Sequence, residues 1–341
     1  MPNAYISGTG FYVPPKVVSN DDLVKDYGID TSHEWIVKRT GIENRRFAEA
    51  GVGSAEMALP ASQMAIEAAG LQPKDIDMII FATLSPRHHF PGDGVRLQQT
   101  LGLPAEGKFV PALDIRNQCS GFLYGLGTAD SMVRSGVYKH VLVVGAECHS
   151  GGLDMSTRGR TVSTLFGDGA GAAIVSATDE DRGIRNWNLG ADGRYADELC
   201  QKVFDTRARP YIEVDDDDIG RTPVDMMWPY MNGRLVFKNA VERMIMALWQ
   251  ATNDADITIN DLDLLVFHQA NMRINQYVQK QIGLPDEKVV HNIQNYGNTT
   301  AATIPILLAE SVRNGRLKPG MKVACVAFGS GFTWGACVID W

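Results

Sequence analysis

Short continuous apolar runs alternate along the chain with segments whose apolar residues recur at helical spacing, a pattern typical of an α/β protein. Two runs are nearly the same, Asp-Ile-Asp-Met-Ile-Ile-Phe at 75–81 and Asp-Leu-Asp-Leu-Leu-Val-Phe at 261–267. Both predict strands of a sheet that is covered on its two faces. A first strand is expected over 4–7, ending in Gly8-Thr9-Gly10.

Capping residues predict where the early helices begin. Asn20 opens one helix, and Ser32 precedes an acidic first turn in a second, which we expect to end near Gly41. Residues 54–70 are small and apolar and close with Gly70, so they predict a buried helix.

The two similar strands belong to a longer internal repeat. Cys119 is as far from Gly136 as Asn298 is from Gly315, and each glycine follows a similar helix end. The repeat predicts a duplicated strand–helix–strand unit in which Cys119 and Asn298 hold corresponding places. The other matching segments are 114–117 with 292–295, 133–136 with 312–315, and 141–145 with 322–326.

We therefore expect two similar halves, 1–183 and 184–341, whose helix starts meet at a pseudo-two-fold axis. Between them, residues 183–230 look irregular. The run Asp215 to Asp218 is better interpreted as a solvated loop than as a cation site. A cluster at its end is either core or the wall of a pocket for an apolar chain: Met226, Met227, Trp228 and Met231.

Composition narrows the function. Of 341 residues, 45% are apolar and 21% charged, which is typical of a globular protein. The formal charge of −8 argues against general nucleic-acid binding, and an acidic partner would need a local basic patch. We expect a cytoplasmic protein without a membrane span or signal peptide, since no apolar run is long enough and the five cysteines form no C-x-x-C pair.

Cys119 lies where an extended segment meets a helix. The helix dipole and unpaired backbone N–H groups at such a start favour a thiolate, so Cys119 is a candidate nucleophile. A buried cysteine acting as a small apolar residue is the alternative, and a lone cysteine would usually be that. Gly8-Thr9-Gly10 lacks the third glycine and the βαβ continuation of a dinucleotide site, so no such cofactor is predicted.

Two partners for the cysteine lie in the second half. His268 follows the repeated strand, at the end where α/β sheets place their sites, and its repeat mate is Ala82, so the repeat itself does not require an imidazole. Asn298 precedes a helix and could equally be part of a turn and helix cap. The glycine-rich turn 327–332 could aim backbone N–H groups at an oxyanion. Together these groups suit a decarboxylating condensation of thioesters.

With these motifs in view, the whole chain resembles the β-ketoacyl-acyl-carrier-protein synthase III family of thiolase-fold condensing enzymes. The resemblance implies a five-layered αβαβα fold, a homodimer and a role in fatty acid biosynthesis and lipid metabolism. It also implies Cys119 as nucleophile, His268 and Asn298 on the malonyl thioester carbonyl, and the N–H groups of Cys119 and Ser330 as oxyanion hole. The motifs that carry it are 30–36 with 39–42, 119–122, 166–172, 268–273, 295–299 and 328–335.

The resemblance assigns further residues. Its substrates would be coenzyme A thioesters and an acyl carrier protein, with no cofactor and no metal. Expected coenzyme A contacts are Trp35, Arg39, Arg160 and Asn271; expected acyl-pocket residues are Met231, Phe328 and Phe90, the last reaching the partner subunit's pocket; expected carrier-protein contacts are Arg273 and Lys280. Without the resemblance, Arg39 and Arg160 would be ordinary surface arginines.

The sequence departs from the family pattern in two places, and both leave the substrate specificity open. Residues 116–118 have larger side chains than the small residues that the family commonly has there, and the segment 205–228 is longer than is usual in the family. The starter acyl chain, and whether the acceptor is bound to carrier protein or coenzyme A, stay undecided. A related enzyme of secondary metabolism is the main alternative, acting by head-to-head acyl condensation, polyketide priming or acyl transfer. A degradative thiolase would need a cysteine where Ala327 stands, and Cys119 argues against a non-catalytic synthase subunit.

Overall fold

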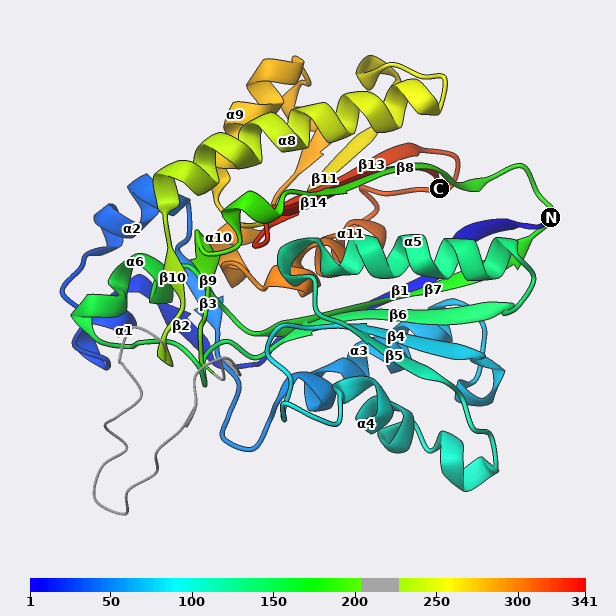
Figure 1. Cartoon of the computed structure of the whole chain (residues 1–341), viewed down its shortest axis with the longest axis horizontal. Helices are drawn as coiled ribbons and strands as arrows, with labels where there is room; N and C mark the ends of the chain where they lie inside the picture. Colours follow the sequence, from blue (N-terminus) through cyan, green and yellow to red (C-terminus); the bar gives the residue numbers. More distant parts are fainter. Residues whose placement is uncertain (204–226) are drawn as a thin grey trace.

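The computed structural model describes residues 1–203 and 227–341, and its centre is formed by two five-stranded sheets (Figure 1). The first sheet has the order β1 (Asn3–Tyr12), β7 (Gly169–Thr178), β6 (His140–Glu147), β4 (Met78–Ala82), β5 (Ala112–Ile115). The second has the order β8 (Gly183–Ala191), β14 (Thr333–Asp340), β13 (Lys322–Gly329), β11 (Leu264–Phe267), β12 (Val289–Val290).

The two sheets repeat one topology. In the first, β4 is parallel to β5 and β6, and β7 and β1 are antiparallel to their neighbours; in the second, β11 is parallel to β12 and β13, and β14 and β8 are antiparallel. The strands at 75–81 and 261–267 that the sequence predicts are therefore equivalent, as β4 and β11. β8 begins at Gly183, beside the predicted division of the halves, whose limits stay a prediction of the repeat.

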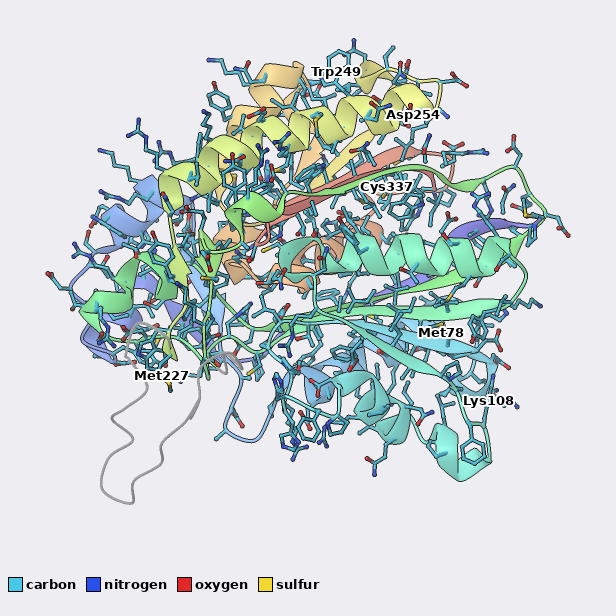
Figure 2. The ribbon with its side chains drawn as sticks, viewed as in Figure 1. Met78, Lys108, Met227, Trp249, Asp254 and Cys337 are labelled. Carbon is cyan, nitrogen blue, oxygen red and sulfur yellow. The ribbon has the colours of Figure 1, made fainter. Side chains whose placement is uncertain are left out.

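Helices complete five layers, αβαβα. One apolar core joins α3 (Ser54–Ala68) and α4 (Asp93–Thr100) to the outer face of the first sheet. A second core surrounds α5 (Gly121–Arg134) and α11 (Thr303–Arg313), which lie between the sheets. A third lies under α8 (Gly233–Asp254) and α9 (Met272–Ile282). Cys337 is in the middle core, whereas Trp249 lies exposed on the outer surface of α8 (Figure 2).

Smaller elements pack at the end of the sheets where α5 begins. They are α1 (Asn20–Lys25), α2 (His33–Thr40), α6 (Arg160–Ser163), α10 (Ile293–Tyr296), β2 (Val17–Ser19) paired with β3 (Asn44–Arg46), and β9 (Leu199–Cys200) paired with β10 (Tyr230–Met231). The 3₁₀ turns are η1 (Pro73–Asp75), η2 (Leu103–Glu106), η3 (Gln118–Ser120), η4 (Thr157–Gly159), η5 (Gly193–Tyr195), η6 (Ile259–Asp261), η7 (Asp286–Lys288) and η8 (Thr300–Ala302).

The predicted capping signals are confirmed. The side chain of Ser19 accepts a hydrogen bond from the N–H of Asp22 at the start of α1, and Ser32 does the same for Trp35 in α2. Gly41 ends α2 with a φ of 75°, where a residue with a Cβ would be strained.

The predicted end of the first strand in Gly8-Thr9-Gly10 is wrong, because β1 continues through these residues to Tyr12. Its glycines serve packing rather than a turn. A Cβ on Gly8 would lie 2.3 Å from the carbonyl oxygen of Ala65, and one on Gly10 would lie 2.2 Å from that of Ala61, so only glycines let α3 lie this close to β1.

The predicted equivalence of Cys119 and Asn298 is also wrong. Each half enters its central helix through a residue with positive φ, Gln118 at 46° and Thr300 at 48°, and this alignment places Ala301 opposite Cys119. Helix α5 has 14 residues and α11 has 11. Counting the same number of residues back from the glycine after each helix therefore reaches Cys119 within η3 in the first half, but Asn298, which precedes η8, in the second half. Likewise the segment 292–295 enters helix α10, whereas its supposed mate 114–117 leaves strand β5.

Asp215 to Asp218, Met226 and most of the long segment 205–228 lie outside the described residues, so the expectations for them are not addressed. Among the residues that the structure describes, no helix has the length and apolar character needed to cross a membrane.

Candidate active site

The turn that carries Cys119 is held from both sides. Asn117 Nδ2 donates to Ser120 Oγ at 3.0 Å, and Ser120 Oγ lies 2.8 Å from Thr333 Oγ1 on β14. The next residue, Gly121, begins α5, and a Cβ on it would lie 3.2 Å from Cβ of Ala82. These contacts place the thiol at the carboxyl end of the first sheet, between β5 and α5, and so confirm that Cys119 lies where an extended segment meets a helix.

The expectation that the helix start favours a thiolate is wrong for this structure. Burial, and to a smaller extent the nearby carboxyl of Glu147, raise the pKa of the Cys119 thiol to about 12. The backbone N–H groups of Ser330 and of Cys119 itself lower it, but by less than desolvation raises it. The thiol is therefore protonated at neutral pH.

The glycine-rich turn after β13 lies against the cysteine. A Cβ on Gly329 would be 2.6 Å from Cβ and 3.0 Å from Sγ of Cys119, so a larger residue could not occupy this position without displacing the thiol. The N–H of Ser330 thus lies beside the sulfur, near the N–H of Cys119. These are the two donors that the resemblance assigns to an oxyanion hole, and the assignment stays a prediction.

His268 stands directly after β11, and its backbone N–H donates to the carbonyl of Val326 at 2.8 Å. Its Nδ1 lies 2.7 Å from Oγ1 of Thr303. The ring is 2% exposed, and burial lowers its pKa to about 3, so the imidazole is neutral. Nε2 is buried and makes no hydrogen bond to any described residue.

Asn298 is 5% exposed, and its backbone pairs with the segment 165–167. Its N–H donates to the carbonyl of Leu165, and its own carbonyl accepts from the N–H of Gly167. Its side-chain oxygen Oδ1 accepts from the N–H of Thr300 at 2.8 Å. With the oxygen engaged, the NH₂ end of the amide is the group available as a donor.

The three predicted residues lie on turns that contact one another, although no hydrogen bond joins their side chains directly. Turn η3, which bears Cys119, contacts both η8 and β13. A Cβ on Gly121 would be 3.7 Å from Cβ of Ala301, which shows how closely the helix starts approach. Thr300 bonds Asn298, and Thr303, at the other end of the same turn, bonds His268.

Sequence reasoning missed two buried residues that brace this turn. Nε2 of His149 lies 2.7 Å from Oγ1 of Thr300, and burial lowers the pKa of this histidine to about 3. The carboxylate of Glu147 accepts from Thr83 Oγ1 at 3.1 Å and from the N–H groups of Leu84 and Ser85 at 3.1 and 3.2 Å. The one available signal was their position, two polar residues at the second and fourth places after the apolar run at 141–145.

The residues expected to contact coenzyme A gather on one surface. The guanidinium carbon of Arg39 lies 4.1 Å from the centre of the Trp35 ring, and that of Arg160 lies 5.4 Å from it. Asn271 caps α9 and donates from Nδ2 to the carbonyl of Arg39 at 3.1 Å. We call Trp35, Arg39 and Arg160 the Trp35 cluster. It presents two cations on an aromatic face, which suits a phosphorylated nucleotide.

The two residues expected to meet a carrier protein, Arg273 and Lys280, are both exposed on α9. They are two helical turns apart and so lie on one face. The structure therefore places them where a partner could reach them.

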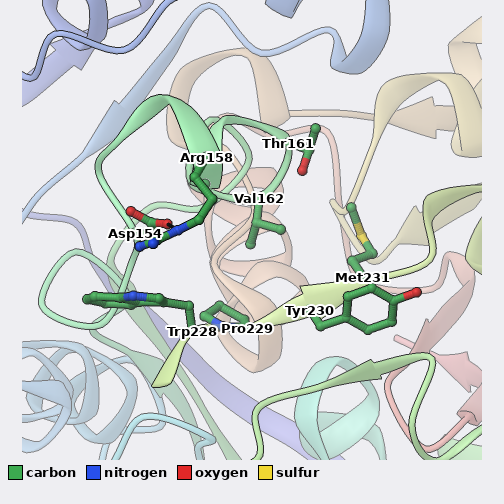
Figure 3. Close-up of a pocket in the computed structure, with 9 residues that line it drawn as sticks. Asp154, Arg158, Thr161, Val162, Trp228, Pro229, Tyr230 and Met231 are labelled. Carbon is green, nitrogen blue, oxygen red and sulfur yellow. Dashed lines mark hydrogen bonds and ion pairs between the residues drawn. The ribbon is translucent and has the colours of Figure 1, made fainter. Parts of the chain in front are cut away.

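A cavity of about 590 Å³ lies between α6 and β10 (Figure 3). Met231 lines it, as do Val162 and Trp228. Cys119, His268 and Asn298 do not line it, so its use by an acyl chain stays a prediction. Phe328 is 4% exposed in the core under α8, whereas Phe90 is 82% exposed and cannot line a pocket within its own chain.

No group of three or more histidine, cysteine, aspartate and glutamate side chains within 1–203 and 227–341 is placed to hold a metal ion.

The family model described as 3-oxoacyl-[acyl-carrier-protein (ACP)] synthase III matches residues 113–193, and its C-terminal counterpart matches 252–341. The chain is 41% identical over 341 residues to β-ketoacyl-[acyl-carrier-protein] synthase III 1 of Halalkalibacterium halodurans, covering 100% of this chain and 99% of that protein.

Solved structures agree in fold. The 3-oxoacyl-[acyl-carrier-protein] synthase III of Aquifex aeolicus superposes with a TM-score of 0.87 at 38% identity, covering 99% of this chain and 100% of that one. The priming β-ketosynthase of the R1128 polyketide pathway superposes with a TM-score of 0.87 at 31% identity, covering 99% of this chain and 96% of that one.

Glu147 makes a pH-dependent contribution to stability that can be measured. Burial raises the pKa of its carboxyl from 4.5 to about 7, so between these values the native state holds a proton that the unfolded state has lost. Raising the pH through this window therefore favours unfolding, by about 1.4 kcal/mol for each unit of pKa difference. We expect Glu147→Gln to flatten the decline of unfolding free energy between pH 5 and about 7.

Urea denaturation at a series of pH values measures this slope. Glu49→Gln, which removes an exposed carboxyl, is the matched control. A slope in Glu147→Gln as steep as that of the unmodified protein would show that Glu147 does not take up the proton.

Proposed function

The chain belongs to the 3-oxoacyl-[acyl-carrier-protein] synthase III family, and on that premise we propose that it is an acyltransferase that condenses an acyl-CoA with a malonyl thioester. The observation that carries the proposal is that Cys119 lies on η3, which contacts η8, and that residues at the two ends of η8 hydrogen-bond Asn298 and His268, in a chain similar to its relatives over its full length.

In the first step Cys119 takes the acyl group. The sulfur attacks the thioester carbonyl of acyl-CoA, the bond to the coenzyme A sulfur breaks, and the thiol proton passes overall to that leaving sulfur. The raised pKa of Cys119 makes the thiol a weak nucleophile at rest. The N–H groups of Cys119 and Ser330 beside it would stabilise the negative charge that develops on the carbonyl oxygen.

In the second step a malonyl thioester loses carbon dioxide. Its carboxylate leaves as CO₂, and the electron pair of the broken C–C bond forms an enolate on the thioester. Hydrogen bonds from Asn298 Nδ2 and His268 Nε2 would stabilise the enolate oxygen. The enolate carbon then attacks the acyl group on Cys119, which gives a β-ketoacyl thioester, and the released sulfur regains a proton.

The Trp35 cluster supports binding of coenzyme A. The adenine could stack on the indole while Arg39 and Arg160 pair with phosphate, and Asn271 lies beside Arg39 on the way to α9. Arg273 and Lys280 would receive an acidic carrier protein that the rest of this protein, with its formal charge of −8, repels.

Polyketide priming is the second candidate, and the R1128 priming synthase is the observation that favours it. Its 31% identity is lower than the 41% and 38% of the fatty acid type relatives, so the latter guide the proposal. The chain has Ala327, fully buried in the core, where a degradative thiolase would need its second cysteine. We also infer that the protein acts in the cytoplasm, since all five of its cysteines are free.

A homodimer formed along β5 is part of the proposal. β5 is an edge strand, and Leu113 on it is 38% exposed. Phe109, just before the strand, is 84% exposed, and Phe90 is 82% exposed. An apolar edge of this kind is normally covered. In a homodimer, β5 would pair with β5 of a second copy, and Phe90 would enter the acyl pocket of that copy.

Acylation of Cys119 tests the central proposal. The protein mixed with a panel of acyl-CoAs should gain one acyl mass, and Cys119→Ala should not. Asn298→Ala should still be acylated but should lose condensation about 10²- to 10³-fold, the usual loss for one donor to an oxyanion. Intact-mass spectrometry reads the adduct, and release of labelled CO₂ from malonyl thioester reads the second step. No adduct with any thioester would contradict the assignment.

Charge reversal on α9 tests the acceptor. Arg273→Glu with Lys280→Glu should raise the KM for malonyl carrier protein about tenfold or more and leave the KM for malonyl-CoA unchanged, because only the protein acceptor needs the basic face. Lys139→Glu is the control, because Lys139 is exposed directly before β6, at the end of the first sheet opposite to the site. Equal effects on both acceptors would show that α9 does not distinguish them.

A substitution on the edge strand β5 tests the proposed homodimer. Sedimentation at micromolar concentration should show a dimer that Leu113→Lys shifts toward monomer, since a charge on the paired edge would be buried without a partner. Trp249→Lys alters an exposed apolar residue on the opposite layer and should leave the dimer intact. A monomeric unmodified protein would refute the interface.

A further inference from the structure

The ring proton of His268 can reside on either nitrogen, and only one choice suits the proposed reaction. A neutral imidazole carries one N–H and one lone pair. Nε2 has no hydrogen-bond partner among the residues that the structure describes, so it is the nitrogen that can meet a substrate. As a donor to an enolate oxygen it must hold the proton, and then Nδ1 must accept a hydrogen bond.

Thr303 is the partner of Nδ1 in the structure. Its Oγ1 lies 2.7 Å from Nδ1, and both side chains are 2% exposed, so water does not compete at this contact. The same hydroxyl lies 3.0 Å from the carbonyl oxygen of Thr300. A hydroxyl has one proton, and whichever of these acceptors receives it determines the tautomer of His268.

The carbonyl of Thr300 does not need this proton. It already accepts from the backbone N–H of Thr303, which closes the 3₁₀ turn η8. Turning the hydroxyl toward Nδ1 therefore leaves no buried carbonyl unpaired, and it makes the shorter of the two contacts. The opposite choice would leave the lone pair of Nε2 facing a substrate carbonyl.

We propose that Thr303 is a positioning residue: its hydroxyl donates to Nδ1 of His268, so that Nε2 carries the ring proton and presents it to the carbonyl of a bound malonyl thioester. The last clause rests on the function proposed above. The same turn orients the second donor, because the N–H of Thr300 engages Oδ1 of Asn298. One turn thus sets the hydrogen-bonding direction of both side chains.

The tautomer can be observed without any substrate. Nitrogen NMR of protein labelled with ¹⁵N-histidine distinguishes a protonated from an unprotonated ring nitrogen, and the spectrum of His268→Ala identifies the signals of His268. The expected result is a protonated Nε2 and an unprotonated Nδ1. A protonated Nδ1 in the unmodified protein overturns the proposal.

Kinetics test the consequence. Thr303→Val keeps the shape but removes the hydroxyl, and it should slow condensation about 10- to 100-fold while Cys119 acylation by acyl-CoA stays unchanged. Thr303→Ser should restore condensation to within about threefold, since the hydroxyl alone is required. Thr252→Val removes an equally buried helical hydroxyl, which donates to the carbonyl of Leu248 on α8, and controls for general loss of stability.

Full condensation activity in Thr303→Val, or an equal loss in Thr303→Ser, also overturns the proposal. If the unmodified protein neither forms an acyl adduct nor releases CO₂, the proposed function fails instead, and the nitrogen spectrum still decides whether Thr303 sets the ring proton.

Discussion

The site depends on the close approach of two turns, η3 and η8, between the two sheets. Small residues make the approach possible. A Cβ on Gly145 would lie 2.3 Å from the carbonyl oxygen of Ala301, and one on Gly329 would lie 2.6 Å from Cβ of Cys119. Because these neighbours are backbone or short side chains, they cannot move aside, and any larger residue would separate the cysteine from the second half.

Burial at this contact determines the charge states of the site. It raises the pKa of the Cys119 thiol and of the Glu147 carboxyl and lowers the pKa of His268 and His149. Each shift favours the neutral form, as desolvation requires. Cys119, His268 and His149 are therefore neutral at neutral pH, so the chemistry of the site depends on where their hydrogen bonds point more than on fixed charges.

The surface complements this neutral interior. The Trp35 cluster and the exposed cations of α9 adjoin each other through Asn271, which bonds Arg39 and caps the helix that bears Arg273. A coenzyme A nucleotide and an acidic carrier protein would thus approach the same side of the molecule. On a protein of formal charge −8, such a local basic region directs binding rather than raising general affinity for anions.

The sequence alone was enough for the α/β class, the equivalent strands at 75–81 and 261–267 and the capped helices, because periodicity and caps are local in the chain; its motifs also predicted the three site residues. It could not align Cys119 with Ala301, since that depends on α11 being one turn shorter than α5. It also could not reveal His149, Glu147, Thr300 and Thr303 as partners. Their roles arise from hydrogen bonds between residues far apart in sequence. In the same way, burial raises the pKa of the Cys119 thiol, whereas the helix dipole would lower it. Only the tertiary structure decides how much water a group loses and which neighbour replaces it.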